Sequence, residues 1–316
     1  MRPSDPALLA ALARHASGSA RATWRVSGVR TVPLLGGYAS KSVDRLDLTL
    51  ATDRGQSVMV SFVRKGCTTR EIRALNLLAE LPGAAARPEV IVAWSSTARP
   101  DDNEANGFAS PFYPGGDLKF GDPMPEAVLA TLARLHAHCS DPGAFDWTWT
   151  FDAAVVRRMR ANALAALRAS APFRSRTPDH THWLARLERA GGSSALEDAQ
   201  GALKRTLVHG DVHAGNIILK EDGSPVIIDW GNVCLATPML DLANVVPLES
   251  AEWRFYLAAY RAAGGDIGET ELRRGYWWAR AVTGLMYVPW AAEHTGRTPA
   301  LIMQVEEAEA RLAELG

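Results

Sequence analysis

One polar segment in the second half of the chain constrains the fold more than any other feature. Residues 207–216 read LVHGDVHAGN, and residues 226–230 read VIIDW. Asp211 therefore precedes Asn216 by five residues, and Asp229 follows an apolar run thirteen residues further on. The residues between the two β-type runs, KEDG at 220–223, have the composition of a hairpin turn. A loop backed by a hairpin is thus predicted to aim two carboxylates and one amide at the same place.

This set of side chains is typical of phosphoryl transfer. That chemistry needs a carboxylate to orient and deprotonate the attacking hydroxyl, and oxygen ligands for a Mg²⁺ ion that bridges the phosphates. A carboxylate at the end of a strand is a usual ligand for a hard cation. A second interpretation stays open, because imidazoles and carboxylates also alternate at residues 179–182 and 209–213. Such a pattern suits Zn²⁺ and would indicate a metallohydrolase.

The first third of the chain is rich in predicted strands. Alternating apolar and β-branched residues between turn residues predict strands at 32–35, 43–52, 57–64, 90–94 and 108–113. A capping signal from Thr68 to Glu71 opens one helix, which extends to about Leu81 before Pro82 stops it. This part of the chain is therefore predicted to be a small β-rich domain that contains one helix.

From Pro125 onward the apolar spacing becomes helical. Helices are predicted at 126–138, 152–169, 182–190 and from 238 to the end, with short strands at 216–219 and 226–228. The predicted fold class is α+β, with a β-rich domain at 1–113 and a larger helical domain at 114–316. The cleft between two such domains is the default ligand site.

Composition excludes several classes of partner. The chain has 316 residues, 47% of them hydrophobic, and a formal net charge of −1, so nothing favours nucleic acid or an anionic membrane as the main partner. No apolar run approaches the ~20 residues that span a bilayer, and the first residues lack the cationic start and cleavage site of a signal peptide. Cys67, Cys139 and Cys234 are scattered, which predicts reduced thiols in a cytoplasmic protein.

Four segments together resemble the aminoglycoside phosphotransferase and choline kinase family, whose members are relatives of protein kinases. HGDVHAGN at 209–216 resembles the catalytic loop of that family, and IDW at 228–230 resembles its metal-binding aspartate segment. LHA at 135–137 and PMLDLA at 238–243 resemble two further segments. The resemblance extends from Gly36 to Asp241, about two thirds of the chain. It implies a two-lobed, protein-kinase-like fold.

The resemblance assigns roles to individual residues of these segments. It implies that Asp211 is the catalytic base, and that Asn216 and Asp229 complete the catalytic site as ligands of Mg²⁺. It also implies that Asp241 braces the catalytic loop, and that His209 holds this loop rather than moving protons.

The resemblance further implies where a nucleotide binds. The turn at 36–42 would cover the phosphates with backbone N–H groups, although an ordinary hairpin turn is the alternative for its two glycines. The segment 108–113 would connect the lobes and meet adenine with its backbone. Glu71 would pair with the nucleotide-binding lysine, and a capping role for it is equally open. The residues implied in nucleotide binding are Gly36, Gly37, Ser40, Lys41, Lys65, Glu71, Ser110 and Phe112.

The third strand departs from the pattern of the family. Alignment of residues 58–62 places Ser61 where the family has a lysine that faces the nucleotide phosphates. Lys65 has the same strand parity but lies ~13 Å further along an extended chain. Three alternatives stay open: a bend brings Lys65 inward, Lys41 reaches down from the glycine-rich turn, or the site works without this lysine.

The implied activity is transfer of the γ-phosphoryl group of ATP, or of GTP, to a hydroxyl of a small molecule. An aminoglycoside or another antibiotic is the first candidate acceptor, which would indicate antibiotic resistance. A kinase of an amino alcohol or a sugar is an alternative, and so is a non-catalytic nucleotide-binding protein, because of Ser61. A protein kinase is not supported, since the chain lacks Asp-Phe-Gly and Ala-Pro-Glu segments. The aromatic residues of the last helices form either helix–helix core or the wall of an acceptor pocket.

Overall fold

The chain folds into two compact units. The computed structural model describes residues 2–18, 24–34, 43–190 and 195–315. The sheet unit comprises Met1–Thr131 and Ala214–Val233, and the helical unit comprises Leu132–His213 and Cys234–Gly316. This division differs from the predicted boundary after residue 113, because residues 114–131 and the hairpin after residue 213 pack with the amino-terminal sheet. Each unit is described by itself below.

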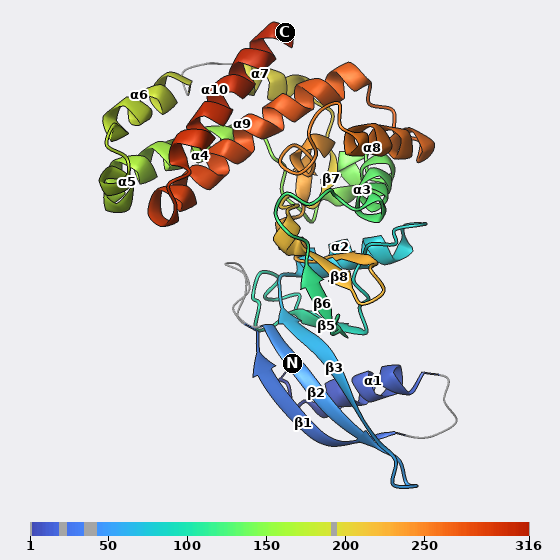
Figure 1. The fold of residues 1–316 in the computed structure, drawn as a ribbon. Coiled ribbons are helices and arrows are strands. Elements are labelled where there is room, and N and C mark those ends of the chain that lie inside the picture. The colour runs from blue at the N-terminus through green and yellow to red at the C-terminus, as the bar shows by residue number, and fades with distance from the viewer. Residues whose placement is uncertain (1, 19–23, 35–42, 191–194, 316) are drawn as a thin grey trace. The chain divides into compact units, whose positions relative to one another are not determined.

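An antiparallel five-stranded sheet forms the base of the sheet unit (Figure 1). Its strands are β1 (Arg25–Pro33), β2 (Val43–Ala51), β3 (Ser57–Gly66), β4 (Val92–Trp94) and β5 (Gly107–Pro111). They are hydrogen-bonded in the order β1-β2-β3-β5-β4. On β2, Leu46, Leu48 and Leu50 alternate with polar residues, so one face of the strand is apolar and buried.

Helix α1 (Pro6–Ser17) covers that apolar face. It begins at the N-cap Asp5, whose carboxylate accepts the backbone N–H of Ala7 at 2.9 Å, with Pro6 in the first turn. Leu8 and Leu12 of the helix are fully buried against the β2 leucines and Phe62 of β3. Side chains on adjacent strand positions point to opposite faces, so Lys65 has the parity opposite to that of Phe62 and lies away from α1.

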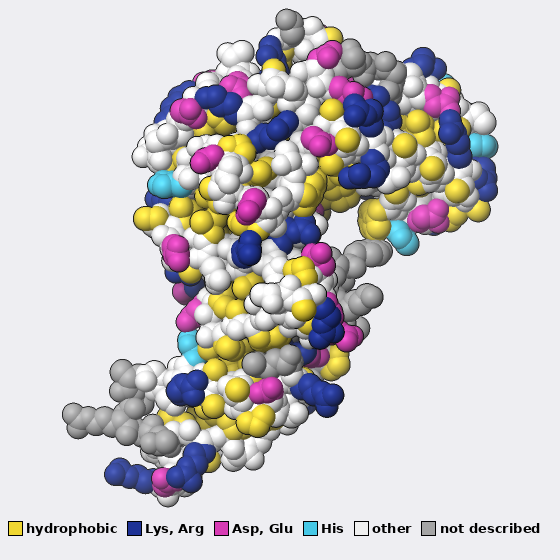
Figure 2. Space-filling model, turned by 180° about the vertical axis from the view of Figure 1, so that it is seen from behind, with side chains coloured by type: hydrophobic (Ala, Val, Ile, Leu, Met, Phe, Trp, Pro, Cys, Tyr) yellow, Lys and Arg dark blue, Asp and Glu magenta, His cyan; other side chains and the backbone are white. Residues whose placement is uncertain are grey.

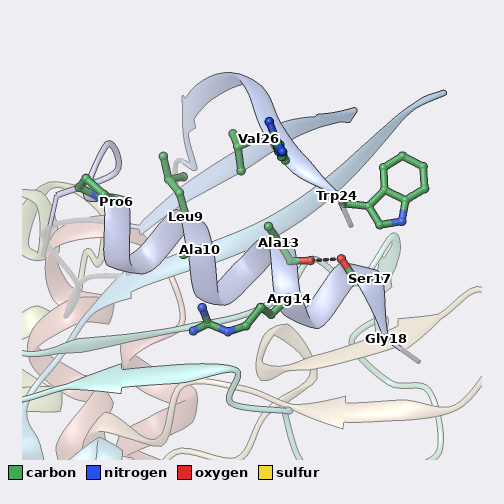
Figure 3. A pocket seen from close by; sticks show the side chains of 10 residues that line it. Pro6, Leu9, Ala10, Ala13, Arg14, Ser17, Gly18, Trp24 and Val26 are labelled. Atoms are coloured by element: carbon green, nitrogen blue, oxygen red, sulfur yellow. Dashed lines mark hydrogen bonds between the residues drawn. The ribbon is translucent and has the colours of Figure 1, made fainter. Parts of the chain in front are cut away.

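A hollow of about 720 Å³ opens between α1 and the start of β1. Figure 3 shows Leu9, Ala10 and Ala13 of the helix and Val26 of the strand lining it, with Arg14 at its edge. The lining is mainly apolar and belongs to the α1 side of the sheet. The hollow is therefore separate from the face that carries Lys65.

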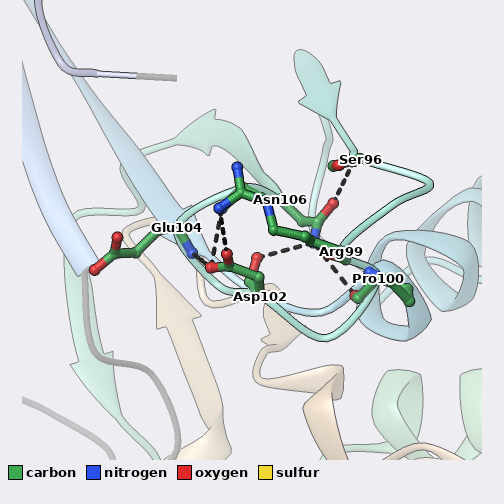
Figure 4. Close-up of polar contacts among 7 residues, drawn as sticks. Ser96, Arg99, Pro100, Asp102, Glu104 and Asn106 are labelled. Atoms are coloured by element: carbon green, nitrogen blue, oxygen red, sulfur yellow. Dashed lines mark hydrogen bonds and ion pairs between the residues drawn. The ribbon is translucent and has the colours of Figure 1, made fainter.

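A polar loop joins β4 to β5, and one amide side chain organises it (Figure 4). Asn106 is fully buried, and its Nδ2 donates to the carbonyl oxygens of Arg99 at 2.6 Å and Asp102 at 2.8 Å. Its Oδ1 accepts the backbone N–H of Ser96. Buried backbone groups need such partners, and these bonds therefore fix the loop that leads into β5.

The sheet unit also contains a second, smaller sheet and helix α2, and these elements include the segment from Asn216 to Asp229. A small antiparallel sheet consists of β6 (Gly115–Asp117), β8 (Ile217–Lys220) and β9 (Pro225–Ile227), in the order β6-β8-β9. The short helices η2 (Ala214–Asn216) and η3 (Trp230–Asn232) flank the β8–β9 hairpin. Helix α2 (Thr69–Glu80) follows β3, and Thr68 caps it. A Cβ atom at Gly115 would overlap the carbonyl oxygen of Leu219, so the close approach of β6 to β8 requires glycine.

Helices dominate the helical unit (Figure 1). They are α4 (Ala153–Ala169), α5 (Ala171–Arg176), α6 (His180–Ala190), α7 (Ala195–Ala202), α8 (Ala251–Ala262), α9 (Glu269–His294) and α10 (Thr298–Leu315), with the short helices η1 (Pro142–Phe145) and η4 (Pro238–Leu240). Helix α3 (Glu126–His138) contains the boundary between the two units. Strands β7 (Thr206–Val208) and β10 (Cys234–Ala236) form an antiparallel pair. The long helix α9 packs against α10, α4 and η4 and forms the core of the unit.

The predicted α+β class is confirmed, and the element boundaries show where local signals fail. Strand β1 begins at Arg25 rather than residue 32, because its exposed positions and Gly28 hide the alternation. Strand β3 extends two residues beyond the predicted end, to Gly66, which places Lys65 inside the sheet. Helix α6 begins at His180, so the histidines near it belong to a helix start rather than to a loop. Among the described residues, no helix has the length and apolar character needed to cross a membrane.

The surface of the helical unit carries charges of both signs. Figure 2 shows Lys and Arg side chains interspersed with Asp and Glu side chains over the face of this unit that it presents. This mixture agrees with the formal net charge of −1 for the whole chain. It does not form a single-sign field of the kind that steers a polyanion onto a protein.

Candidate functional site

The sheet unit holds a buried lysine between two carboxylates. Lys65, near the end of β3, places its Nζ atom 2.7 Å from Oε1 of Glu71 and 2.6 Å from Oδ1 of Asp229. Glu71 lies in the first turn of α2, and Asp229 follows β9. Thr68 accepts the backbone N–H of Glu71 at 3.4 Å, so the cap positions the helix start while the carboxylate pairs with the lysine. The capping and ion-pair roles considered for Glu71 are therefore both present.

The electrostatics of this cluster keep the lysine charged. Lys65 is 9% exposed and Glu71 is 2% exposed. Burial lowers the pKa of the Lys65 ammonium, but the charges and hydrogen bonds of Glu71 and Asp229 outweigh burial and raise the pKa above its ordinary value. An ammonium in this setting is a fixed positive charge of the kind that binds phosphate.

The structure corrects the alignment of the third strand. Ser61 lies four residues before Lys65 on the same face, and its Oγ donates to Oδ1 of Asp47 at 2.7 Å. Arg45 also binds Asp47, and these two hydrogen bonds lower the pKa of that carboxyl group. Ser61 is thus engaged by β2, and Lys65 is the residue that meets helix α2. Of the three alternatives, the structure supports an inward Lys65, because β3 continues to Gly66 and Lys65 pairs with Glu71.

The β8–β9 hairpin brings together the two predicted metal ligands. The backbone N–H of Ile228 donates to the carbonyl oxygen of Asn216 at 2.8 Å, which sets Asn216 beside the chain that leads into Asp229. Asn216 is 8% exposed, and the Asp229 side chain is about a quarter exposed. An amide and a carboxylate are oxygen donors that suit Mg²⁺, since this ion keeps several waters and takes further ligands from substrate phosphates. The donor set therefore fits the implied ion.

Asp229 has an unusual backbone conformation. Its φ and ψ angles are 61° and 62°, in the left-handed region that residues other than glycine rarely adopt. Aspartate tolerates this region better than most residues. Strained backbone of this kind is concentrated at functional sites, where the surrounding structure holds it in place. The conformation turns the chain out of β9 directly at the carboxylate that meets Lys65.

In the helical unit, one buried carboxylate fixes the loop that carries Asp211. Asp241 is 1% exposed, and its two oxygens accept the backbone N–H groups of His209 at 2.8 Å and Gly210 at 2.7 Å. Gly210 has a φ angle of 82°, which glycine adopts without strain. The His209 ring accepts the backbone N–H of Asp211 at 3.2 Å. The bracing role predicted for Asp241 and the holding role predicted for His209 are therefore present in the structure.

A second buried contact anchors the brace itself. His136 of α3 is fully buried, and its Nε2 lies 3.1 Å from Asp241. Its Nδ1 lies 2.8 Å from the hydroxyl group of Tyr256 on α8. The LHA and PMLDLA segments of the sequence thus meet at one hydrogen-bond network. Because each buried polar group has a partner, the network is rigid and positions the loop from behind.

Sequence reasoning missed one direct partner of Asp211. The hydroxyl group of Tyr287 on α9 donates to Oδ1 of Asp211 at 2.9 Å. His213 lies near the same oxygen, with its Nε2 at 3.9 Å. Tyr287 belongs to an apolar, aromatic helix, and nothing in its spacing distinguishes it from the core aromatics around it. Only the fold reveals that it faces the loop.

Other predicted nucleotide-binding residues have a mixed outcome. Gly36, Gly37, Ser40 and Lys41 lie outside the described residues, so their roles stay predictions. Ser110 is buried in β5, opposite Val63 of β3. The backbone N–H of Phe112 donates to Ser61 at 3.1 Å, and the Arg45 guanidinium lies 5.2 Å from the centre of the Phe112 ring. The contact of Ser110 and Phe112 with a nucleotide therefore stays a prediction.

The predicted site residues fall into two groups. Lys65, Glu71, Asn216 and Asp229 belong to the sheet unit, whereas Asp211 belongs to the helical unit. The convergence of Asp211, Asn216 and Asp229 on one ion and one phosphate therefore stays a prediction. In the described part of the chain, no group of three or more His, Cys, Asp or Glu side chains is placed to hold a metal ion.

The acidic side chains of the last helices are mostly held by basic partners. Glu249 and Glu269 both bind Arg273, and Asp266 binds Lys204 at 2.9 Å. Because basic side chains within the unit already balance their charge, these three carboxylates give no support to an amine-bearing acceptor.

The chain resembles known phosphotransferases in sequence and in fold. Residues 51–278 match the model of the phosphotransferase enzyme family. A spectinomycin phosphotransferase solved with ADP and spectinomycin shares 14% identity with the chain, at a TM-score of 0.53, over 92% of this chain and 93% of that one. An ethanolamine kinase from Plasmodium vivax shares 13% identity at a TM-score of 0.53, over 91% and 83% of the two chains.

A third similar structure is LicA in complex with AMP, which shares 15% identity at a TM-score of 0.51 over 96% of both chains. Likeness at such low identity shows the fold, which is protein-kinase-like, with a β-rich amino-terminal part and a helical carboxy-terminal part. The family match covers more than half of the chain. The protein is therefore an enzyme that belongs to the phosphotransferase enzyme family.

Proposed function

We propose that the protein transfers the γ-phosphoryl group of ATP, or of GTP, to a hydroxyl group of a small molecule, with Asp211 as the base. The observation that carries this proposal is the buried Lys65 ammonium between Glu71 and Asp229. A lysine held by a helix glutamate is the arrangement that binds nucleotide phosphates in kinase-like enzymes. The family match supports the same chemistry.

The sheet unit supplies the groups for nucleotide binding. Lys65 would bind phosphate oxygens of the nucleotide, and Glu71 would keep its side chain extended toward them. Asn216 and Asp229 would hold a Mg²⁺ ion, which neutralises charge on the β- and γ-phosphates when it is bound. The ammonium group of Lys65 also balances the negative charge of Asp229, which lies 2.6 Å away.

The helical unit supplies the group that acts on the acceptor. An ionised Asp211 accepts the proton of the acceptor hydroxyl as its oxygen attacks the γ-phosphorus. A new O–P bond forms, the bond to the β-phosphate oxygen breaks, and the nucleoside diphosphate leaves. The brace from Asp241 holds the loop in one geometry, and such positioning is most of what protein contributes to phosphoryl transfer.

We propose an antibiotic of the aminoglycoside type as the first acceptor to test, and an amino alcohol or a sugar as the second. Support for an antibiotic comes from the likeness of the fold to that of a spectinomycin phosphotransferase, and support for an amino alcohol from its likeness to that of an ethanolamine kinase. The non-catalytic alternative was motivated by Ser61, and the Lys65–Glu71 pair removes this motive.

A panel of alcohols tests the proposal. Purified protein with MgATP or MgGTP is incubated with aminoglycosides, spectinomycin, choline, ethanolamine and sugars, while release of the nucleoside diphosphate is followed. Mass spectrometry then checks each acceptor for the mass of one phosphate. We expect stimulation by one class of alcohol together with this mass gain. Nucleotide binding without turnover for any acceptor would instead favour a non-catalytic protein.

If an antibiotic is the acceptor, expression of the protein should raise the concentration of that antibiotic needed to stop bacterial growth. The Asp211→Asn variant is the matched control for this assay. The reaction uses a nucleoside triphosphate, so we propose the cytoplasm as its place. The three cysteines are buried free thiols, which suits a reducing compartment.

A further inference from the structure

Tyr287 donates a hydrogen bond directly to the carboxylate proposed as the base. Its hydroxyl oxygen lies 2.9 Å from Oδ1 of Asp211, and the two residues are separated by 76 positions in the sequence. Burial raises the pKa of the Tyr287 phenol, and the negative charge of Asp211 raises it further. The phenol therefore keeps its proton at neutral pH. An ionised carboxylate only accepts hydrogen bonds, so the bond is a charge-assisted O–H···O⁻ contact.

Both partners of this bond are anchored to the same short helix. The loop that carries Asp211 is held by Asp241, which directly follows η4. Helix α9 passes so close to η4 that a Cβ atom at Gly275 would lie 2.5 Å from Oγ1 of Thr237. In addition, the hydroxyl group of Thr283 on α9 lies 3.0 Å from Oδ1 of Asn244, just after η4.

A further contact fixes the end of α9 that carries Tyr287. One turn before the tyrosine, a Cβ atom at Gly284 would lie 2.7 Å from Cγ2 of Val305 on α10. Close packing of this kind leaves no room for α9 to shift relative to α10. The donor and the acceptor of the Tyr287–Asp211 bond are thus held in place before any substrate binds.

The buried aromatic residues of α9 make different contacts from the half-buried Tyr287. Tyr276 packs edge-on against Trp253, and Trp278 packs edge-on against Phe151. These are ring contacts within the core, as expected for an apolar helix. Tyr287 instead directs its polar end at a carboxylate in the catalytic loop, so its role extends beyond filling the core.

We propose that Tyr287 is a positioning residue for Asp211. The phenol hydrogen bond to Oδ1 fixes the orientation of the Asp211 carboxylate, so that the acceptor hydroxyl meets a carboxylate oxygen in a defined position. This inference rests on the proposed function, in which Asp211 is the base. To the proposed function it adds a residue of α9 that lies beyond the family match, which ends at residue 278.

The test compares Tyr287→Phe with Tyr276→Phe, the same chemical change on the same helix. The assay uses the acceptor found in the alcohol panel and, if the panel finds none, water as the acceptor in nucleotide hydrolysis. We expect kcat of Tyr287→Phe to fall by about 10- to 100-fold, the range for loss of one hydrogen bond to a charged group. The KM for MgATP should stay near the wild-type value, because Tyr287 belongs to the helical unit. Tyr276→Phe should keep the wild-type kcat.

The pH profile separates positioning from a merely structural role. Without the phenol, the carboxylate loses a hydrogen bond that favours its charged form, so the acidic limb of kcat should move to higher pH. Replacement of Tyr287 by 3-fluorotyrosine keeps the shape but makes the donor more acidic, and the limb should move to lower pH. This second variant keeps the test valid if Tyr287→Phe folds poorly.

An unchanged kcat and an unchanged acidic limb in both variants would overturn the proposal. A higher kcat in Tyr287→Phe would also overturn it, because the phenol would then compete with the acceptor for Asp211. If the wild-type protein transfers phosphate neither to an alcohol nor to water, the proposed function itself fails. Activity of the wild type together with indifference to Tyr287 would remove only the inference about this residue.

Discussion

At the scale of single residues, the buried carboxylate of Asp241 accepts hydrogen bonds on both of its oxygens. It accepts two backbone N–H groups of the loop that carries Asp211 and lies 3.1 Å from a ring nitrogen of His136. A buried carboxylate without such partners would carry a large desolvation penalty. The loop is therefore fixed, because any change in its shape would remove the hydrogen-bond partners of the buried Asp241 carboxylate.

The Asp211→Asn variant should lose turnover but keep nucleotide binding. An amide cannot accept the acceptor proton in the way that a carboxylate does, and general-base catalysis contributes about 10²- to 10⁴-fold in rate. The groups proposed to bind the nucleotide lie in the sheet unit, and this variant does not change them. Turnover by product release and affinity by calorimetric titration with MgATP measure the two effects. Asp101→Asn, an exposed loop position, serves as the control, and near-wild-type turnover in Asp211→Asn would remove Asp211 from the mechanism.

The Lys65→Met variant should weaken both stability and nucleotide affinity. Glu71 would lose the cation that lies 2.7 Å from its carboxylate, and Asp229 would lose the cation at 2.6 Å. Removal of one partner from a buried ion pair destabilises a protein by about 3–5 kcal/mol. Urea unfolding at pH 7 measures the stability, with Lys119→Met at an exposed position as control. Equal free energies of unfolding for Lys65→Met and the wild type would show that Lys65 does not pair with Glu71 and Asp229 in solution.

At the scale of elements, the contact between α4 and α10 contains a carboxylate with a weak partner. Glu309 of α10 is 8% exposed, and Arg160 of α4 places Nη2 3.6 Å from its Oε1. Burial raises the pKa of Glu309 to about 7, and Arg160 only partly opposes this effect. The neighbouring Glu306 of α10 contributes to this raised pKa, although Glu306 is itself paired with Arg186 of α6. The helix contact is therefore sensitive to pH.

This carboxyl group should make the protein less stable as pH rises. Between about pH 4.5 and pH 7 the folded state binds more protons at Glu309 than the unfolded state, so the free energy of unfolding falls with rising pH. The pKa difference from the ordinary 4.5 to about 7 corresponds to a loss of about 3 kcal/mol. Glu309→Gln mimics the protonated form at every pH, so it should match the wild type near pH 4.5 and exceed its stability at pH 8.

Urea unfolding of the wild type and Glu309→Gln at pH 4.5, 6 and 8 measures this difference. Glu314→Gln is the matched control, because Glu314 is on the same helix and its side chain is exposed. That variant should show the same pH dependence as the wild type. A difference between wild type and Glu309→Gln that does not grow from pH 4.5 to pH 8 would contradict the argument.

At the scale of the whole molecule, the residues proposed to bind the nucleotide and the residue proposed as the base belong to different units. Lys65, Asn216 and Asp229 belong to the sheet unit, and Asp211 with its supports belongs to the helical unit. A nucleotide that binds only the folded protein stabilises it by RT ln(1 + [L]/Kd), which is about 2.7 kcal/mol at a ligand concentration of 100 Kd. Binding should therefore be visible as a rise in the melting temperature.

MgATP should raise the melting temperature of the wild type by about 5 °C or more at saturating concentration. The rise should shrink when EDTA removes Mg²⁺, since we propose Asn216 and Asp229 as the ligands of this ion. In Asp229→Asn the difference between MgATP and ATP with EDTA should become small, whereas Asp211→Asn should behave like the wild type. A magnesium effect that survives in Asp229→Asn would exclude this residue as a ligand.

The sequence by itself determined the local features of this protein. Helix caps at Thr68 and Asp152, the turn at 220–223 and the alternating leucines of β2 depend only on neighbouring residues, and the structure has all of them. The segment 209–216 likewise indicated its chemistry, because the residue types and their spacing are close together in the chain. Edge positions such as the start of β1 were missed, since exposed strands carry a weak pattern.

Only the tertiary structure decided which distant groups meet. Lys65 and Asp229 are 164 positions apart, and Tyr287 and Asp211 are 76 apart. Contacts across such separations depend on how helices and strands pack, and packing depends on the shapes of many side chains at once. For that reason only the folded chain shows that Lys65, and not Ser61, pairs with Glu71, and that Tyr287 of α9 meets the loop that carries Asp211.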